Sequence, residues 1–395
     1  MDPLCQSQSL PYLQQLAADG HKVALMTYEQ PQFRLDAAEQ SRTRALLQEQ
    51  GIYWYPMRYH KRFSLAATAY DCFRGIITGR SIVRRHGIRL VHSRATVPAV
   101  VAVALARICG LRFLYDADSR LSEEYADNGH WPRDGIRFRL AAAFESLARR
   151  RADSIIVLSE QLRVDFQQRF GVNAPVEVIP CCVDTNEFIR TPQTRQDRRD
   201  SLKIAADQKL LIYVGKIGPR YLVAEAFRFY AEVCKRQPAR LLILSGDSSE
   251  DFAAIAQEQG VSPKQFDVKC VSRAAVIEWL CAADAGLALI RTANCERGSS
   301  PIKIGEYLAM GLPVVVTEGI GDYSEAIRLH RLGTVSAARN ADDLKQAVDE
   351  LQELWHEGSS VSDRCRLFAR GHLDLANTGG SRYRAVYDAL LCEGS

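Results

Sequence analysis

A lysine and a glutamate three residues apart follow two serines and a proline in the segment 299–316, "SSPIKIGEYLAMGLPVVV". Ser300 is a good N-cap residue and Pro301 suits the first helical position, so the segment predicts a helix from about 301 to 310. The N–H groups that begin a helix carry about half a positive charge and bind phosphate. Residues 299–303 therefore form a candidate phosphate site, which Lys303 would strengthen.

Glu306 lies one helical turn beyond Lys303 in this predicted helix. Its carboxylate can accept hydrogen bonds from two neighbouring hydroxyls, as the diol of a ribose requires. The same two residues equally suit an exposed i, i+3 ion pair that contributes only about 0.2–0.5 kcal/mol. Spacing alone leaves both interpretations open.

Short β-branched runs alternate with helical segments along the chain, which is typical of parallel sheets covered by helices. A polar stretch at 190–208 has no strand-like run and is the best candidate for a domain linker. The pattern predicts an α/β protein of two doubly wound domains facing a cleft, with ligands at the carboxyl ends of the strands. The predicted strands are "KVALMTY", "IYWYPM", "RLVHS", "RFLYDAD", "SIIVLS" and "VEVIP", and after the linker "LLIYVG", "RLLILSG", "FDVKCV", "AGLALI", "LPVVVT" and "GTVSA".

The first of these domains lacks an expected element. A helical pattern begins at about residue 7, and no apolar strand precedes it. Either the true N-terminus lies upstream or the domain lacks a strand that is usually central, and we favour the first option because the second exposes two unpaired neighbours.

The composition is that of an ordinary globular protein, with 47% hydrophobic and 25% charged residues. No apolar run approaches the roughly 18 residues of a membrane-spanning helix, and the N-terminus has no secretory pattern, so we expect a cytoplasmic protein. Eleven cysteines, an odd number without a C-x-x-C pair, favour neither a disulfide framework nor a zinc site.

The net charge of +4 is too small to indicate a nucleic-acid partner, but residues 58–94 hold nine Lys or Arg and one acid, Asp71. A probable helix at 64–86 places arginines on one side and apolar residues on the other, namely Phe63, Ala67, Tyr70, Phe73 and Ile77. This segment could contact anionic lipid headgroups or a lipid-diphosphate acceptor at the inner face of the membrane. The alternative is a solvated helix packed on the sheet through its apolar stripe.

The segment 299–316 closely resembles the C-terminal signature of GT-B glycosyltransferases of the family 4 type, in the form Ser-Pro-x-Lys-x-x-Glu-Tyr-x-Ala-x-Gly-x-Pro-Val. The resemblance extends over nearly the whole chain through "YLQQLAADGHKVALMT", "ADSIIVLSEQLRVDF", "VIPCCVDTNEF" and "LIYVGKIGPR". It implies an acceptor domain at 1–183, a nucleotide-sugar donor domain at 184–370, and a C-terminal helix within 371–395 that crosses back to the first domain.

The resemblance also implies roles for individual residues. Glu306 would hold the ribose of the nucleotide, and Lys216 and Arg220 would grip the donor diphosphate, with no metal or other cofactor required. The loop after the third donor-domain strand would hold the base, and the start of the signature helix would hold the donor; these donor-binding residues are Val271, Ser272, Arg273, Ser299, Ser300, Pro301, Ile302 and Lys303. Without the resemblance, Lys216 and Arg220 would read as solvated loop charges.

Two features of the sequence concern the residues that would contact the donor sugar. The family often has an earlier glutamate eight positions before the second, but here that position is Gly298, and Glu296 is out of register. In the first domain, "YDADSRLSEE" ends a strand where the family places a His or Asp at the anomeric carbon, so Asp118 is the candidate and Asp116 the second choice. An Asp there could equally cap the following helix.

The implied reaction moves a hexose-type sugar from a nucleotide diphosphate donor to a hydroxyl of a saccharide or lipid-linked acceptor, with retention of configuration, in surface polysaccharide or glycolipid biosynthesis. A nucleotide-sugar epimerase on the same fold and a non-catalytic binding or scaffold protein remain alternatives. A nicotinamide enzyme is disfavoured because no G-x-G-x-x-G follows any strand.

Overall fold

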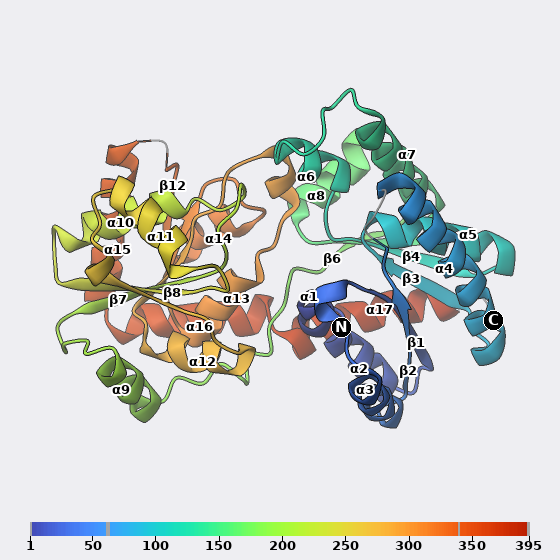
Figure 1. Ribbon diagram of the computed structural model, residues 1–395, viewed down its shortest axis with the longest axis horizontal. Helices are drawn as coiled ribbons and strands as arrows, with labels where there is room; N and C mark the ends of the chain where they lie inside the picture. The colour runs from blue at the N-terminus through green and yellow to red at the C-terminus, as the bar shows by residue number, and fades with distance from the viewer. Residues whose placement is uncertain (1, 61–63, 339, 393–395) are drawn as a thin grey trace. The chain divides into compact units, whose positions relative to one another are not determined.

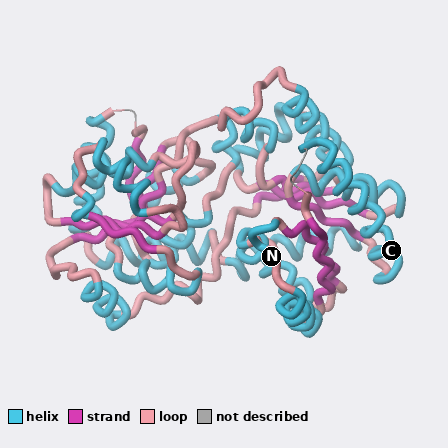
Figure 2. The backbone as a smooth tube through the Cα atoms, viewed as in Figure 1, coloured by secondary structure: helices cyan, strands magenta, loops and turns pink. Residues whose placement is uncertain are grey.

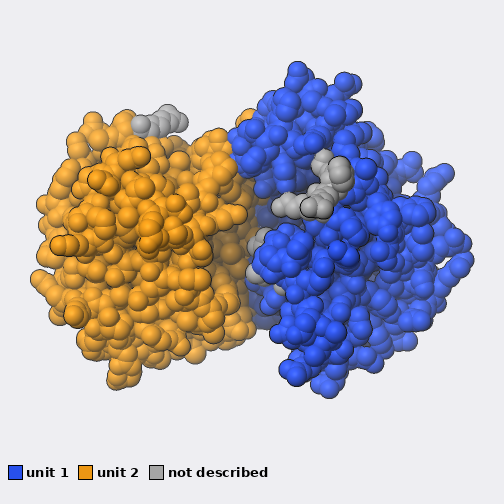
Figure 3. Space-filling model, in the orientation of Figure 1, with its two compact units in different colours: residues 1–180, 375–395 blue, residues 181–374 orange. Residues whose placement is uncertain are grey.

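The computed structural model describes residues 2–60, 64–338 and 340–392. The chain forms two compact units (Figure 3): unit 1 comprises residues 1–180 and 375–395, and unit 2 comprises residues 181–374. Phe63, which the sequence placed on an apolar helix face, lies outside the described residues.

A parallel sheet lies at the centre of unit 2, and its strands are drawn in magenta in Figure 2. Its six described strands lie in the order β12-β11-β10-β7-β8-β9. From β7 the chain moves outward through β8 to β9. It then returns to the other side of β7 and moves outward through β10 and β11 to β12, so the order of strands reverses between β7 and β10. Its strands are β7 (Lys209–Val214), β8 (Ala239–Leu244), β9 (Phe266–Lys269), β10 (Ala285–Ala288), β11 (Val314–Thr317) and β12 (Gly333–Ser336). Its helices are α9 (Pro192–Ser201), α10 (Val223–Cys234), α11 (Ser249–Glu258), α12 (Arg273–Ala282), α13 (Ile302–Met310), α14 (Tyr323–His330), α15 (Ala341–His356) and α16 (Ser359–His372).

Helices cover both faces of this sheet (Figure 1). Side chains alternate along a strand, so Leu210 and Ile212 of β7 join a core with α12, α13 and α16, whereas Leu211 and Tyr213 join a core with α10, α11 and α15. Burial on both faces explains why the strands of unit 2 read as continuous apolar runs.

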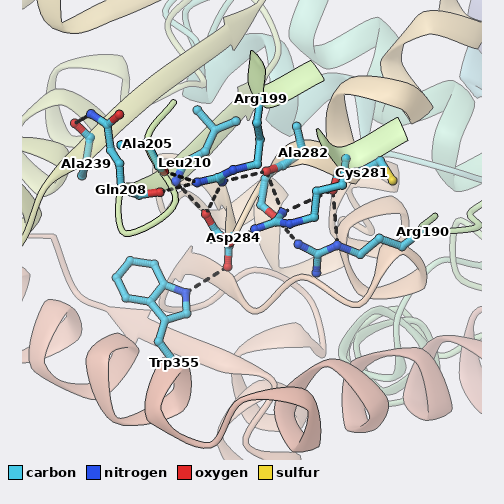
Figure 4. Close-up of polar contacts among 12 residues, drawn as sticks. Arg190, Arg199, Ala205, Gln208, Leu210, Ala239, Cys281, Ala282, Asp284 and Trp355 are labelled. Atoms are coloured by element: carbon cyan, nitrogen blue, oxygen red, sulfur yellow. Dashed lines mark hydrogen bonds and ion pairs between the residues drawn. The ribbon is translucent and has the colours of Figure 1, made fainter. Parts of the chain in front are cut away.

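The polar stretch predicted as a linker is instead a helix inside unit 2. Thr191 caps α9 by accepting a hydrogen bond from Thr194 N–H. Arginines of this segment then reach the end of α12. Arg195 donates to the Ala282 carbonyl at 2.7 Å and pairs with Asp284 at 2.6 Å. Arg199 donates to the same carbonyl at 3.3 Å (Figure 4). The linker interpretation was wrong because these contacts, and not an apolar stripe, hold the helix.

Unit 1 contains two parallel sheets among the described residues, one of order β1-β2 and one of order β3-β4-β5-β6. The strands are β1 (Val23–Glu29), β2 (Ile52–Arg58), β3 (Leu90–Arg94), β4 (Arg112–Ala117), β5 (Ser154–Val157) and β6 (Val176–Val178). The helices are α1 (Pro3–Gln8), α2 (Leu10–Ala18), α3 (Ala37–Glu49), α4 (Ser64–His86), α5 (Thr96–Cys109), α6 (Leu121–Asp127), α7 (Ile136–Arg151), α8 (Glu160–Val164) and α17 (Ser381–Cys392). Two helices precede β1, as the helical pattern near residue 7 predicted.

The apolar stripe of α4 is exposed, so the alternative in which the helix packs on the sheet through this stripe is wrong. Tyr70, Phe73 and Ile77 are 50%, 62% and 56% exposed. These positions are spaced i, i+3 and i+7, so they line one side of the helix. The stripe is therefore not the surface through which α4 packs on unit 1.

All twelve predicted strand segments are strands, and together with the helices on each sheet they confirm two Rossmann-like domains. Within the described ranges, no helix is both long enough and apolar enough to cross a bilayer.

Candidate active site

The carboxyl ends of β7 and β10 lie side by side at the switch point of the unit 2 sheet, which is where doubly wound sheets bind ligands. The loop after β7 carries Lys216 and Arg220, and the segment after β10 leads through Glu296 into α13. The two segments are joined by the backbone, since Arg291 N–H donates to the Arg220 carbonyl at 2.8 Å.

Tyr307 fixes α13 against the strands. Its hydroxyl accepts a hydrogen bond from Val214 N–H at 2.9 Å and donates to the Leu287 carbonyl at 3.4 Å. Its ring lies against Gly286, where a Cβ would come within 2.2 Å of the ring. The tyrosine beside Glu306 thus sets the position of the helix whose first turn carries the candidate residues.

The start of α13 differs from the predicted N-cap arrangement. The helix begins at Ile302 with Pro301 at the N-cap position, and within the described chain no N-cap side chain accepts from its first turn. Ser300 is not the cap because its hydroxyl accepts from Cys181 N–H at 3.0 Å and contacts the Tyr323 hydroxyl at 3.2 Å. Ile304 N–H donates to the Pro301 carbonyl at 3.0 Å, and the earlier N–H groups of this turn are left to a ligand or solvent.

Lys303 is 8% exposed, and its amine points to the end of β7. Nζ lies 5.0 Å from the ring centroid of Tyr213 and 4.5 Å from that of Tyr221. No described residue forms a hydrogen bond with it. Burial, and then the charge of Arg220, lower the pKa of Lys303 to about 7, while Glu306 opposes the shift.

Glu306 is 1% exposed and forms an ion pair with Arg273, the first residue of α12. The pair links the loop after β9 to α13, so the structure brings the predicted ribose residue and the predicted base loop together. Ser272 caps α12 by accepting from Ala275 N–H, and Val271 is half-buried. The exposed i, i+3 Lys303–Glu306 pair considered above is wrong, because both side chains are buried.

Arg220 forms an ion pair with Glu296, with 2.8 Å between Nη2 and Oε2. Glu296 is 4% exposed, and its carbonyl accepts from the Ser299 hydroxyl at 3.0 Å. Lys216 is exposed, and its carbonyl accepts from the Tyr213 hydroxyl at 2.9 Å. Sequence spacing missed Glu296 as a partner of Arg220, and its only hint was its proximity to the expected glutamate position.

In unit 1, Asp116 lies near the end of β4 and Asp118 directly follows that strand, both beside Arg94 of β3. Asp116 is 1% exposed and accepts from Arg94 at 3.1 Å and from the Tyr383 hydroxyl of α17 at 2.7 Å. Asp118 lies 3.4 Å from Arg94 Nε and keeps 27% of its side chain exposed. Asp118 does not cap α6, whose N-cap residue is Arg120. Asp116 thus holds α17, and Asp118 is the more accessible carboxylate.

Burial raises the pKa of Asp118 to about 6. Arg94 opposes this shift, and the nearby carboxylates Asp116 and Glu124 add to it. A carboxyl group with such a pKa changes its charge close to neutral pH, which suits acid–base chemistry.

Comparison with known proteins agrees with this architecture. Residues 12–187 match the family model "Glycosyltransferase Family 4", and residues 194–366 match "Glycosyl transferases group 1". Among solved structures, sucrose-phosphate synthase from Thermosynechococcus elongatus superposes with a TM-score of 0.76 at 15% identity, covering 96% of this chain and 92% of that one. Anabaena Alr3699/HepE, solved in complex with UDP and glucose, gives a TM-score of 0.71 at 14% identity, covering 96% and 95%.

Two relatives resemble the chain in sequence. D-inositol 3-phosphate glycosyltransferase 2 of Catenulispora acidiphila is 26% identical over 52% of this chain and 49% of its own length, so the match spans about half of that relative. GDP-mannose-dependent alpha-(1-6)-phosphatidylinositol monomannoside mannosyltransferase of Mycolicibacterium smegmatis is 24% identical over 69% of each chain. With both domain models matched in order and the GT-B architecture in place, the chain belongs to the GT-B glycosyltransferases of the family 4 type, the glycosyl transferases of group 1.

Proposed function

We propose that this glycosyltransferase moves a hexose-type sugar from a nucleotide diphosphate sugar to a hydroxyl of a saccharide or lipid-linked acceptor. The observation that carries the proposal is the gathering of Lys303, Arg220 and Glu306 around the start of α13, at the switch point of the unit 2 sheet. Cationic groups and free helix N–H groups suit a diphosphate, and a buried carboxylate suits the hydroxyls of a ribose.

In the proposed mechanism, Lys216, Arg220 and the first turn of α13 stabilise the negative charge that grows on the nucleoside diphosphate as the glycosidic bond breaks. Because these groups offset that charge, the reaction needs no metal ion. An oxygen of the departing diphosphate accepts the proton of the acceptor hydroxyl, and the configuration at the anomeric carbon is retained. Asp118 of unit 1 is proposed to face the anomeric carbon, where its ionised carboxylate would stabilise the positive charge that develops there as the bond breaks.

The proposed pathway is the biosynthesis of surface polysaccharide or glycolipid. Sequence similarity supports it, since the relative from Mycolicibacterium smegmatis is named as a phosphatidylinositol monomannoside mannosyltransferase. A GDP-sugar and a UDP-sugar are both represented among the names of similar proteins, so the nucleotide is left to experiment.

The decisive experiment is a thermal-shift panel of UDP, GDP, ADP and their sugar conjugates. We expect one nucleotide diphosphate to raise the unfolding midpoint of the wild type, through mass-action stabilisation of the folded state. The shift should be lost in Glu306→Ala and kept in Glu258→Ala, which removes an exposed glutamate at the end of α11. A folded wild-type protein that shows no shift with any nucleotide would overturn the proposal.

The nucleotide found in this way defines the transfer assay. Transfer that continues in EDTA and yields a product with the donor's anomeric configuration supports the metal-independent, retaining reaction. Loss of transfer in EDTA, or inversion at the anomeric carbon, contradicts it. Sugar altered at another carbon without transfer would identify an epimerase instead.

We also propose that the enzyme works in the cytoplasm at the inner face of the membrane, which it contacts through α4. The exposed stripe of Tyr70, Phe73 and Ile77 can enter the headgroup region. Exposed arginines of the same helix suit anionic lipids, each contributing about 1 kcal/mol; they are Arg74, Arg80, Arg84 and Arg85.

Sedimentation with vesicles tests this contact. The wild type should bind vesicles containing phosphatidylglycerol and bind pure phosphatidylcholine weakly. Phe73→Ser with Ile77→Ser should lose most of that binding, while Leu329→Ser with Leu367→Ser, at exposed leucines of unit 2, should retain it. Equal binding by both double variants would remove α4 from the proposal.

A further inference from the structure

The amine of Lys303 is enclosed in a way that a solvated phosphate-binding lysine is not. It lies over the faces of Tyr213 and Tyr221 and has no hydrogen-bond partner in the described parts of the chain. A Cβ at Gly215 would come within 2.8 Å of Nζ, so the amine lies close against the backbone that follows β7. An ammonium with three unused donors and little water is strongly disfavoured.

The charged and titratable groups around this amine come from four elements. Arg220, in the loop after β7, repels a second positive charge, and Glu306 on α13 attracts it. Each is already engaged, Arg220 with Glu296 after β10 and Glu306 with Arg273 of α12. The phenols of Tyr213 and Tyr221 lie against the amine, Tyr307 shares its helix, and Lys216 is exposed in the loop after β7. The other charged or titratable residues of these elements are Arg291, Cys295 and Arg297 after β10 and Glu278 and Cys281 of α12.

Two independent features indicate where a ligand would accept hydrogen bonds from the Lys303 amine. The first turn of α13, a helix of nine residues, has no N-cap side chain in the described chain, and Lys303 lies in that turn. The buried amine is unpartnered on the same side, at the carboxyl end of β7. A phosphate oxygen supplies both things the amine lacks, a hydrogen-bond acceptor and a negative charge.

Resting on the donor site proposed above, we propose that Lys303 takes up a proton as the donor diphosphate binds, so that donor affinity is coupled to pH. Burial and Arg220 lower the pKa of Lys303 to about 7 in the protein alone. A bound diphosphate raises it, because the anion favours the charged amine. Binding therefore brings in a proton wherever pH lies between these two values.

The direction in which donor affinity changes with pH follows from the linkage between protonation and binding. Below about pH 7 the amine is charged before and after binding, and its titration leaves donor affinity unchanged. Between about pH 7 and the higher pKa of the complex, affinity falls about tenfold for each pH unit. Measurements above about pH 7.5 avoid the titration of the terminal phosphate itself, whose pKa is about 6.

Isothermal titration calorimetry tests the coupling with UDP, GDP and ADP in turn. At about pH 8.5, two buffers of different ionisation enthalpy should reveal uptake of close to one proton per bound nucleotide. Lys303→Met should bind more weakly, with no uptake and a flat affinity between about pH 7.5 and 9.5. Lys303→Arg, which stays charged throughout, should also show no uptake.

Lys216→Met is the matched control, because it removes an exposed lysine of the same site. It should weaken binding but keep the proton uptake and the slope of affinity with pH. A wild-type protein that binds nucleotide without uptake and with a flat affinity would overturn the coupling and leave the donor site standing. A protein that binds none of the three nucleotides at pH 7 would overturn the donor site and the coupling with it.

Discussion

Arg220 and Glu296 are paired across the switch point of the unit 2 sheet, with 2.8 Å between Nη2 and Oε2. One residue follows β7 and the other follows β10. Glu296 is buried, so its charge is weakly screened and acts strongly on the neighbouring guanidinium. The arginine proposed to grip the donor diphosphate thus already has a carboxylate as its partner.

Glu296→Gln should therefore bind the nucleoside diphosphate more tightly. Removing the carboxylate frees the charge of Arg220 for the anion and removes a repulsive charge near it. A charged hydrogen bond contributes about 1.5–3 kcal/mol, so we expect roughly a tenfold lower Kd by calorimetry. Glu258→Gln, an exposed control, should leave the Kd unchanged. Weaker binding in Glu296→Gln would instead show that Glu296 holds Arg220 in its productive position.

The pKa of Asp118, which burial raises to about 6, predicts a pH dependence of turnover. The carboxylate form is lost as pH falls through this value. If the ionised group acts in the reaction, kcat should fall about tenfold per pH unit below about pH 6 and stay level above it. Asp118→Asn should lose most activity while keeping nucleotide affinity. A kcat profile that is flat down to pH 5 would exclude this role.

The contact of Gly286 with Tyr307 predicts a packing defect. In Gly286→Ala the new Cβ would lie 2.2 Å from a ring whose hydroxyl is tied to Val214 and Leu287. The ring cannot move freely, so the free energy of unfolding should fall by about 3 kcal/mol, measured by urea denaturation. Gly371→Ala in α16 meets no atom within 4 Å and should stabilise by about 0.5–1 kcal/mol. Equal effects would contradict the packing argument.

Asp284 joins α9 to the sheet and predicts a pH-dependent contribution to stability (Figure 4). Burial by itself would raise the pKa of Asp284, but Arg195, the Leu210 N–H and Arg199 hold it below its usual range. Its stabilisation is therefore present above the unfolded pKa of about 3.9 and is lost as pH falls below that value. Asp284→Asn should cost about 3 kcal/mol at pH 7, and much less near pH 3, by guanidinium denaturation. A cost independent of pH would contradict this assignment.

The strands were predictable because their pattern is local. Each predicted run combines β-branched residues with a length of a few positions, and in unit 2 both faces are buried, so the pattern is continuous and easily recognised. The helix α13 was predictable in the same way, with Gly311 ending it at φ 79°. The helix α9 was missed because its polar composition lacks the apolar stripe, and Arg195 and Arg199 hold it through carbonyls and Asp284.

The N-cap of α13 shows where local rules stop. Ser300 has the right type and place for a cap, but a backbone N–H from Cys181, which is 119 residues away in the chain, occupies its hydroxyl. The stripe on α4 is a second case: its spacing was visible, and only the packing of unit 1 decided that Tyr70, Phe73 and Ile77 stay exposed.

The sequence by itself determined the fold class, the family and the residue types of the donor site, because periodicity and the Ser-Pro-x-Lys-x-x-Glu-Tyr signature are written in consecutive residues. Only the tertiary structure decided the state of those residues. It buried Lys303 between Tyr213 and Tyr221 and paired Arg220 with Glu296, contacts between segments that meet only when β7 and β10 lie side by side. Burial and charge neighbours arise from that packing, so no spacing along the chain could have shown them.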